Sequence, residues 1–207
     1  TEPQGRLAVL DEPHNLEEFP PRAMTGYKTH FEGHGEFCVS ASSDGVTPSY
    51  TIWKAFDKTV NGLGWHDQNV PYTDGVYSGT QSLAGISGEW ITLKLPYKIN
   101  LKSVAIAPRS GNTLSQRSAG SGVILGSNDG NNWDQLHSFS GLTATDYEFT
   151  NINNIIAPGY YKTIAIVVTE LVGKPPTINI TSLNISEIKF FGTREQGQSV
   201  LHDGQLT

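Results

Sequence analysis

The feature that most constrains the fold is a succession of short β-forming segments separated by turn residues. In residues 36–42, Phe37, Val39 and Ala41 alternate with polar positions and share one face, as in a half-buried strand. Similar segments rich in β-branched and aromatic residues follow at 50–57, 88–96, 99–109, 121–127, 133–139, 146–152, 160–170 and 182–192. We find no convincing helix of three turns. This spacing favours an antiparallel sandwich or barrel over a parallel sheet of βαβ units.

Composition supports an all-β domain that is stabilised by its apolar core. Among 207 residues, 22 are Gly and 11 are Pro, while only 16% are charged, which is typical of a chain with many turns. Hydrophobic residues make up 37%, which is enough for a sizeable core. Because Cys38 is the one cysteine, no internal disulfide can form.

The charge distribution argues against nucleic acid and against membrane insertion. The net charge is −6, and residues 1–20 account for −4 of it, with five acidic residues and one basic residue. The body of the chain is close to neutral, so it offers no electrostatic basis for binding phosphates or an anionic membrane. The longest apolar run, IAIVV at 164–168, is far shorter than the ~20 residues of a membrane span.

The pattern divides the chain into three parts. Residues 1–35 contain several prolines and no clean period, so we expect an extended N-terminal segment. Residues 36–193 carry the β pattern and form the predicted domain. Residues 194–207 are polar and lose the pattern, which predicts a C-terminal linker or tail.

A turn closed by a tryptophan, GSNDGNNW at 126–133, allows two interpretations. Asn128, Asp129 and Gly130 suit a tight β-hairpin, and Trp133 then returns to a core between sheets. The alternative makes Trp133 a platform for a sugar ring. We favour the hairpin with a core tryptophan.

The long segment 65–88 carries the aromatic and polar side chains of a candidate ligand-binding loop. Sugar rings place their C–H faces on aromatic rings, and short polar side chains bind the hydroxyls. The alternative is a loop folded over its own tyrosines, but its length favours a function. The candidate ligand-binding residues in it are His66, Asp67, Tyr72 and Tyr77.

Two arginines, Arg109 and Arg117, flank the loop SGNTLSQ at 110–116. A guanidinium group can donate two hydrogen bonds to neighbouring oxygens, which suits vicinal hydroxyls or a carboxylate. Alternatively, one arginine binds carbonyls within the loop. Arg109, after Pro108 at a strand end, is the better structural candidate, and Arg117 is the better ligand candidate.

The sequence gives no positive signal for an enzyme. It contains no Gly-x-Ser-x-Gly, no phosphate-binding loop and no convincing zinc motif. We therefore expect a non-catalytic protein.

Four segments, taken in order, resemble discoidin (coagulation factor 5/8 type C) domains. YTIWKAFDKTVNGLGW (50–65) is similar to their A-x-D-G…x-W segment, and GEWITLKLPYKINLKSVAIAPR (88–109) to their paired strands. RSAGSGVILGSNDGNNWDQL (117–136) resembles their S-x-D-G-x-x-W hairpin, and SLNISEIKFFG (182–192) their closing strand. The resemblance covers about 36–193 and extends to the related family 32 carbohydrate-binding modules. It implies a galactose-binding-like jelly-roll sandwich of two antiparallel sheets.

The same resemblance implies a structural calcium ion. In the related modules an Asp after Ala-Phe and the Glu of the last strand coordinate calcium with backbone carbonyls, and these positions are Asp57 and Glu187 here. The implied carbonyl donors are Ala55, Thr59, Leu63 and Ser186. Calcium prefers six to eight such oxygen ligands. Two departures stand against it, because Lys58 replaces the usual Gly and Leu63 replaces the usual Ser or Thr. Without calcium, Asp57 would cap a turn and Glu187 would be a solvated strand residue.

Two function hypotheses follow. The first is a non-catalytic module that recognises cell-surface or extracellular glycans through loops at one end of the sandwich. The second is a structural docking module that contacts neighbouring subunits of a virion or extracellular assembly and binds no sugar. Residues 17–30 and 78–90 also look like modules in structural proteins of large DNA viruses of algae. Either hypothesis places the protein outside the cell or on a virion surface.

Overall fold

The computed structural model describes residues 16–45, 47–61, 63–68, 70–109, 111, 114–176 and 180–196. The described residues form strands and two short 3-10 helices, so the all-β antiparallel prediction is confirmed. The elements are β1 (Glu17–Phe19), β2 (Lys28–Phe31), β3 (Gly35–Ala41), η1 (Ile52–Phe56), β4 (Trp65–His66), β5 (Tyr72–Thr73), β6 (Val76–Tyr77), β7 (Ser82–Leu83), β8 (Ile86–Ser87), β9 (Glu89–Pro108), η2 (Leu114–Arg117), β10 (Ala119–Ser127), β11 (Trp133–Phe139), β12 (Thr150–Ile152), β13 (Tyr161–Leu171) and β14 (Asn184–Arg194).

Strand β9 connects the two layers of the fold. Residues 89–94 pair with β13, and part of this half also pairs with β3. Residues 99–108 pair with β14, and 104–106 also pair with β12. We expected 88–96 and 99–109 as separate strands within a sandwich of two sheets. Because they form one continuous strand, the pairing joins twelve strands into one sheet, and only the β7–β8 hairpin is separate.

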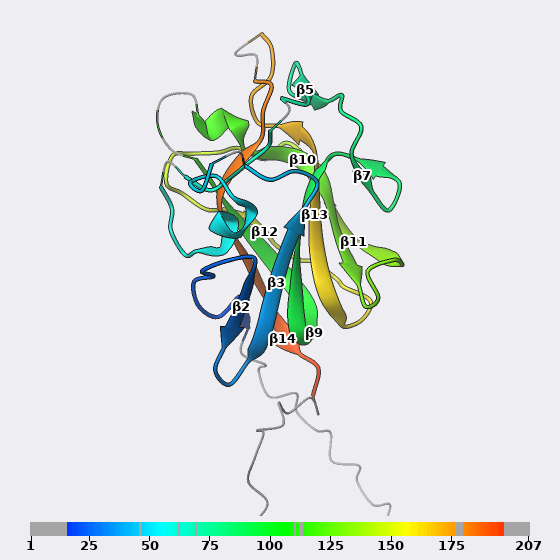
Figure 1. Ribbon diagram of the computed structural model, residues 1–207. Helices are drawn as coiled ribbons and strands as arrows, with labels where there is room; N and C mark the ends of the chain where they lie inside the picture. The colour runs from blue at the N-terminus through cyan, green and yellow to red at the C-terminus, as the bar shows by residue number, and fades with distance from the viewer. Residues whose placement is uncertain are drawn as a thin grey trace, which may run out of the picture.

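Both halves of β9 face one core. Ile91 and Leu93 of the first half and Val104 and Ile106 of the second half belong to the same buried cluster. Phe190 of β14 is also fully buried in it. The core therefore lies between the layers, and the long strands β3, β9 and β13 run along the molecule with short strands and turns gathered at one end (Figure 1).

The segment 50–57 forms a 3-10 helix rather than a strand. The amide of Ile52 donates to the side-chain oxygen Oδ1 of Asp44 (2.8 Å), and the amide of Lys54 donates to the carbonyl of Thr51 (3.0 Å). These bonds close the turn while Ala55 and Phe56 pack into the core. The aromatic content of this segment thus reflects core packing and not a strand.

The folded domain begins before residue 36, within the segment that we expected to precede it. Strand β1 pairs with β14, and β2 pairs with β3. Phe19, Met24 and Phe31 are buried in the core. At the other end, β14 extends to Arg194, which pairs with Glu17 (2.6 Å). Residues 1–15 and 197–207 lie outside the described part of the chain.

Trp133 lies on the outer face of the sheet, which corrects our interpretation of it as a core residue between layers. It packs on a second apolar cluster built around Leu125, Ala165 and Val167, and its indole N–H donates to the carbonyl of Gly130 (3.2 Å). The β7–β8 hairpin covers part of this cluster. The predicted turn before Trp133 is present, since the Asp129 carboxylate accepts hydrogen bonds from the amides of two following residues and Gly130 has φ +79°.

No helix among the described residues has the length and apolar character required to cross a membrane.

Candidate functional site

Four side chains meet at the loop-rich end of the sandwich, and we call them the loop-end cluster: Tyr50, His66, Arg109 and Arg117. Tyr50 precedes η1, and His66 ends β4, which pairs with the first residues of β14. Arg109 directly follows β9, and Arg117 ends η2. The structure therefore brings together three of the predicted ligand-binding residues from separate elements.

Direct contacts hold the cluster together. The guanidinium of Arg109 lies 5.1 Å from the centre of the Tyr50 ring, and its Nη2 donates to the Tyr50 hydroxyl (3.1 Å). The rings of Tyr50 and His66 are 5.7 Å apart at an angle of 50°. Arg117 Nη1 is 3.2 Å from His66 Nε2. Tyr50 is thus in contact with both Arg109 and His66, and Arg117 joins through the imidazole.

The surroundings of His66 favour its neutral imidazole form. Burial lowers its pKa, the nearby charges of Arg117 and Arg109 lower it further, and only its interaction with the backbone of Asp67 opposes them. A guanidinium group can only donate hydrogen bonds, so Nε2 of His66 accepts from Arg117 and the ring proton is assigned to Nδ1.

Both guanidinium groups retain unused donors. The Nε atoms of Arg109 and Arg117 are buried and have no hydrogen-bond partner among the described residues. A buried donor without an acceptor costs about 1–3 kcal/mol. The arginines are therefore held by neighbouring side chains without having all their hydrogen bonds satisfied.

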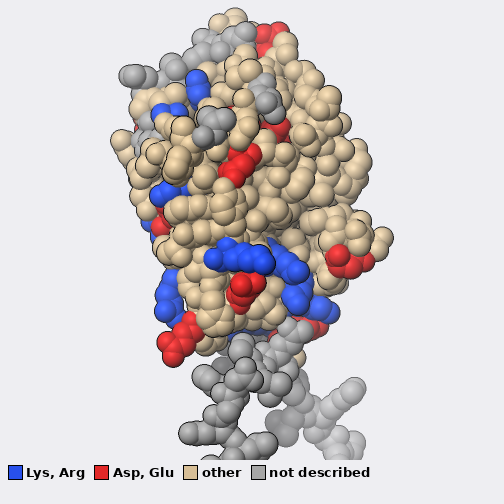
Figure 2. Space-filling model, in the orientation of Figure 1, with Lys and Arg blue, Asp and Glu red and all other residues tan. Residues whose placement is uncertain are grey.

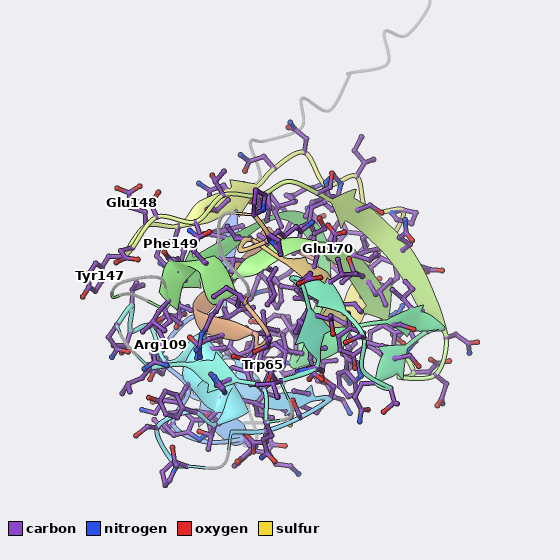
Figure 3. All side chains as sticks on the ribbon, turned by 90° about the horizontal axis from the view of Figure 1, so that it is seen from above. Trp65, Arg109, Tyr147, Glu148, Phe149 and Glu170 are labelled. Carbon is purple, nitrogen blue, oxygen red and sulfur yellow. The ribbon has the colours of Figure 1, made fainter. Side chains whose placement is uncertain are left out.

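An exposed aromatic side chain, Tyr147, lies at the edge of the same end. The carboxylate of Asp146 accepts the amide of Gly111 (3.0 Å), which ties the loop of Tyr147 to the loop after Arg109. Tyr147 is 64% exposed, and seen from above it lies at the outer edge while Arg109 lies nearer the centre (Figure 3). Neither Tyr50 nor Tyr147 was singled out from the sequence. The signal available was a tyrosine beside turn-forming residues.

Three other predicted ligand residues lie elsewhere. Asp67 is 1% exposed, and its carboxylate accepts the amides of Val70 and Leu183. Tyr72 is 2% exposed and donates to the carbonyl of Val168 (2.9 Å). These two side chains are therefore inaccessible at the surface, because burial and backbone contacts fix them.

Tyr77 is part of a separate hollow formed by the long loop. Its ring packs against Tyr72 at 5.3 Å, and its hydroxyl accepts the amide of Gln81 (2.8 Å). Both tyrosines thus support the loop itself, which is the alternative that the sequence left open. The hollow has a volume of about 390 Å³ and is lined partly by Glu89.

The residues implied for calcium lie on facing segments. Glu187 is fully buried, its Oε2 accepts the amide of Lys58 (2.9 Å), and its Oε1 has no partner among the described residues. Asp57 Oδ1 accepts the amide of Thr59 (3.0 Å), and its Oδ2 is 3.3 Å from Lys54 Nζ. Glu187 is therefore not the solvated strand residue of the alternative interpretation.

The loop that follows Asp57 is fastened to β14. The hydroxyl of Ser186 donates to the carbonyls of Thr59 (3.3 Å) and Asn61 (3.0 Å). Gly64, with φ +124°, lies against the backbone of Ile185, where an added Cβ would be 2.2 Å from the carbonyl oxygen. Carboxylates and carbonyls thus gather here, and the unpartnered buried oxygen of Glu187 fits a cation. The described residues contain no group of three or more His, Cys, Asp or Glu side chains suited to a metal. Any calcium here would therefore need backbone carbonyls.

Comparison with known proteins identifies the fold. Neither a protein-family model nor a curated protein matches the chain. Among solved structures, CpGH89CBM32-5 from Clostridium perfringens, in complex with GalNAc-β-1,3-galactose, is 18% identical with a TM-score of 0.56. The match covers 75% of this chain and 95% of that one. The family 32 carbohydrate-binding module of Clostridium perfringens NanJ, in complex with galactose, is 15% identical with a TM-score of 0.53, over 75% of this chain and 93% of that one.

The same fold occurs within a larger enzyme. A family 89 glycoside hydrolase from Clostridium perfringens is 19% identical with a TM-score of 0.53, and the match covers 88% of this chain but 16% of that one. The protein therefore has the fold of family 32 carbohydrate-binding modules, which confirms the resemblance seen in the sequence. These three structures are bacterial, and the likeness to viral structural proteins stays a prediction.

Proposed function

We propose that the protein is a non-catalytic glycan-binding module and that the loop-end cluster contacts the sugar. The observation that carries the proposal is the packing of the Arg109 guanidinium and the His66 imidazole against the Tyr50 ring, with the Arg117 guanidinium against His66. It occurs in a fold shared with modules solved in complex with galactose and with GalNAc-β-1,3-galactose.

The cluster supplies the kinds of group that a sugar requires. Arginine offers paired donors for neighbouring hydroxyl oxygens, and a neutral imidazole can accept or donate a hydrogen bond. The exposed ring of Tyr147 offers an apolar face for the C–H side of the sugar. In this proposal, Arg109 and Arg117 bind hydroxyls and Tyr147 packs against the ring.

The chemistry of the cluster supports binding without cleavage. Glycoside hydrolysis generally uses two carboxyl groups about 5–10 Å apart on either side of the scissile bond. Asp67, the residue that follows His66, is buried, and its carboxylate accepts two backbone amides. It is therefore not placed to act on a bound sugar.

A glycan array followed by calorimetry tests the proposal. Galactose and GalNAc-β-1,3-galactose are the first probes, since the fold neighbours were solved with them. Arg117→Ala should weaken binding at least about tenfold, as expected for the loss of a charged hydrogen bond of ~1.5–3 kcal/mol. Arg22→Ala is the matched control, because Arg22 donates to the carbonyl of Glu32 in the β2–β3 hairpin region. A wild-type protein that binds nothing on a diverse array would contradict the proposal.

We also propose a structural calcium ion between Asp57 and Glu187. The carboxyl group of Glu187, whose Oε1 is buried and unpartnered, and the neighbouring carboxyl group of Asp57 would supply the side-chain ligands. The backbone carbonyls of Ala55, Thr59, Leu63 and Ser186 would complete the oxygen shell. Bound calcium would fasten this loop to β14, next to the strand β4 that ends with His66.

One observation favours the second hypothesis, docking to a neighbouring subunit. Leu16, Ile156 and Tyr160 are exposed, by 54%, 86% and 37%, and line a hollow of about 1070 Å³. Apolar side chains gathered in this way are typical of interaction sites. Sedimentation at rising concentration should show self-association that Ile156→Ser weakens. A wild-type protein that stays monomeric at high concentration would contradict docking between copies.

A further inference from the structure

The outer face of β3, β9 and β13 carries a groove that the loop-end cluster does not use. The groove has a volume of about 270 Å³ and lies between Trp90 and Trp133. Its other lining residues come from β3, β7, β9, β13 and the β10–β11 turn: Cys38, Ser40, Leu83, Thr92, Lys94, Gly130 and Thr163. We call it the two-tryptophan groove.

Strand register explains the shape of the floor. Ser40 of β3 lies opposite Thr92 of β9, and Thr92 lies opposite Ala165 of β13. Side chains alternate between faces along a strand, so these three share the outer face as one row. Because Ser40 and Thr92, the two members of this row that line the groove, are small, the floor is low. Trp90 lies two residues from Thr92 on the same face, and Trp133 stands at the far side, separated from Thr163 by Ser127 of β10.

The floor also carries ordered hydroxyl groups. Ser40 Oγ and Thr92 Oγ1 are 2.7 Å apart, and Thr92 is only 6% exposed. Thr163 and Lys94 lie opposite each other and add a hydroxyl and an ammonium group at the lower end. The indole nitrogen of Trp90 is buried and has no hydrogen-bond partner among the described residues. The groove thus combines two aromatic walls with several hydrogen-bonding groups.

From this arrangement we infer that the two-tryptophan groove is a second glycan-binding site, which takes one pyranose unit of an oligosaccharide. Pyranose rings have apolar C–H faces and hydroxyl edges, which match indole walls and a hydroxyl floor. The volume lies just below the ~300–1,000 Å³ of pockets for drug-sized ligands, which suits a single ring. Much of this face is uncharged, with Lys and Arg in a band across its lower part, and a neutral sugar therefore fits it (Figure 2).

The groove is separate from the loop-end cluster. The cluster is built from Tyr50, His66 and the loops after β9 and around η2, and none of its residues lines the groove. Each site would therefore bind its own sugar unit, either of one longer glycan or of two branches of the same glycan. The expected consequence is two binding events per chain, with avidity on a multivalent surface.

Calorimetry on a loop-disabled variant tests the inference. The double variant Arg109→Ala, Arg117→Ala is titrated with tetrasaccharides of glucose, galactose, mannose and N-acetylglucosamine. It should still bind at least one of them, with one site per chain. Adding Trp133→Ala should weaken that binding at least about tenfold, since loss of one aromatic platform removes a large share of a small ligand's contact area.

A blocking substitution guards against an effect of Trp133→Ala on folding. Ser40 is exposed at the groove edge, so Ser40→Tyr fills the groove while the core stays intact. In an otherwise wild-type chain it should reduce the stoichiometry from two sites to one. The inference is overturned if the loop-disabled variant binds none of the tetrasaccharides, if adding Trp133→Ala to that variant leaves its affinity within twofold, or if Ser40→Tyr in the wild-type chain leaves two sites. If Arg117→Ala abolishes all of the glycan binding that the wild type shows, the result supports the loop-end site alone and overturns the second site.

Discussion

The buried carboxylate of Asp67 should make stability depend on pH in a defined direction. Asp67 is 1% exposed, its carboxylate accepts the amides of Val70 and Leu183, and its own amide donates to the carbonyl of Leu183 (3.2 Å). These bonds fasten the long loop beside His66 to the start of β14. Burial raises the pKa of Asp67 from 3.8 to about 7.

The sign follows from proton linkage. Between the unfolded pKa of 3.8 and the folded pKa of about 7, the folded protein holds a proton that the unfolded chain has released. The stabilisation that this proton gives the folded protein is complete below the unfolded pKa and is lost as pH rises through the folded pKa. One pKa unit corresponds to about 1.36 kcal/mol, so the full effect is about 4 kcal/mol, and about 3 kcal/mol of it is lost between pH 5 and pH 8.

Asp67→Asn isolates this contribution. Asparagine has one side-chain oxygen, so one of the two backbone amides loses its acceptor, at a cost of about 1–3 kcal/mol. The variant should therefore be less stable than the wild type at pH 5. The difference should shrink by about 3 kcal/mol by pH 8, because the variant has no proton to lose.

Urea unfolding followed by tryptophan fluorescence at pH 5, 6.5 and 8 measures the difference. Asp74→Asn is the matched control, because Asp74 is an exposed acidic residue in the same loop. It should follow the wild type at each pH. If the free energies of unfolding of Asp67→Asn and of the wild type change in parallel with pH, the carboxyl group does not titrate as the structure implies.

Three further predictions concern the site and its supports. Because the pKa of His66 is lowered, glycan affinity measured by calorimetry should be constant above pH 6.5 and should fall at lower pH, where the protonated imidazole repels Arg117. The variant His66→Gln should bind more weakly, and its affinity should not change with pH. Calcium at a hundredfold excess over its Kd should stabilise the wild type by about 2.7 kcal/mol, or about 5–10 °C in Tm, whereas Asp57→Asn should not respond and Asp74→Asn should; equal melting in chelator and calcium would exclude the ion. Gly64→Ala should lower the free energy of unfolding by about 1–3 kcal/mol or more, because its Cβ would overlap the carbonyl of Ile185, whereas Gly85→Ala has open space around it and should show only the smaller cost of a positive φ. Equal losses of stability in urea unfolding would contradict this prediction.

The strands that carry the core were predictable because their signal is local. Alternation of apolar and polar residues, or richness in β-branched and aromatic residues, marked β3, β10, β11, β13 and both halves of β9 close to their observed bounds. The hairpin turn at Asp129 and Gly130 was equally local, since it depends on the conformational preferences of adjacent residues. Alternation could not show that the halves of β9 join, because Pro96 and Lys98 look like a turn and only pairing to different neighbours on each side makes the strand continuous.

The two faces of a strand are another case that local pattern leaves open. Trp133, which we expected in the core, lies on the outer face, as does Trp90. That face is apolar because the β7–β8 hairpin returns over Leu125 and Val167 from a distant part of the sequence. When both faces of a strand are covered, its sequence pattern no longer shows which aromatic residue points toward the core.

The sequence by itself determined the fold class, the near-neutral charge of the body of the chain, and the choice of Arg109 and Arg117 as candidate ligand-binding residues. Strand periodicity, charge and residue chemistry are properties of the chain. Tertiary structure alone decided which polar residues form a site. Asp67 and His66 are neighbours in sequence, but the pairing of β4 with β14 buries one and leaves the other against Arg117. Tyr50 reaches Arg109 across 59 residues of chain. Such contacts depend on packing between distant segments, which no local pattern encodes.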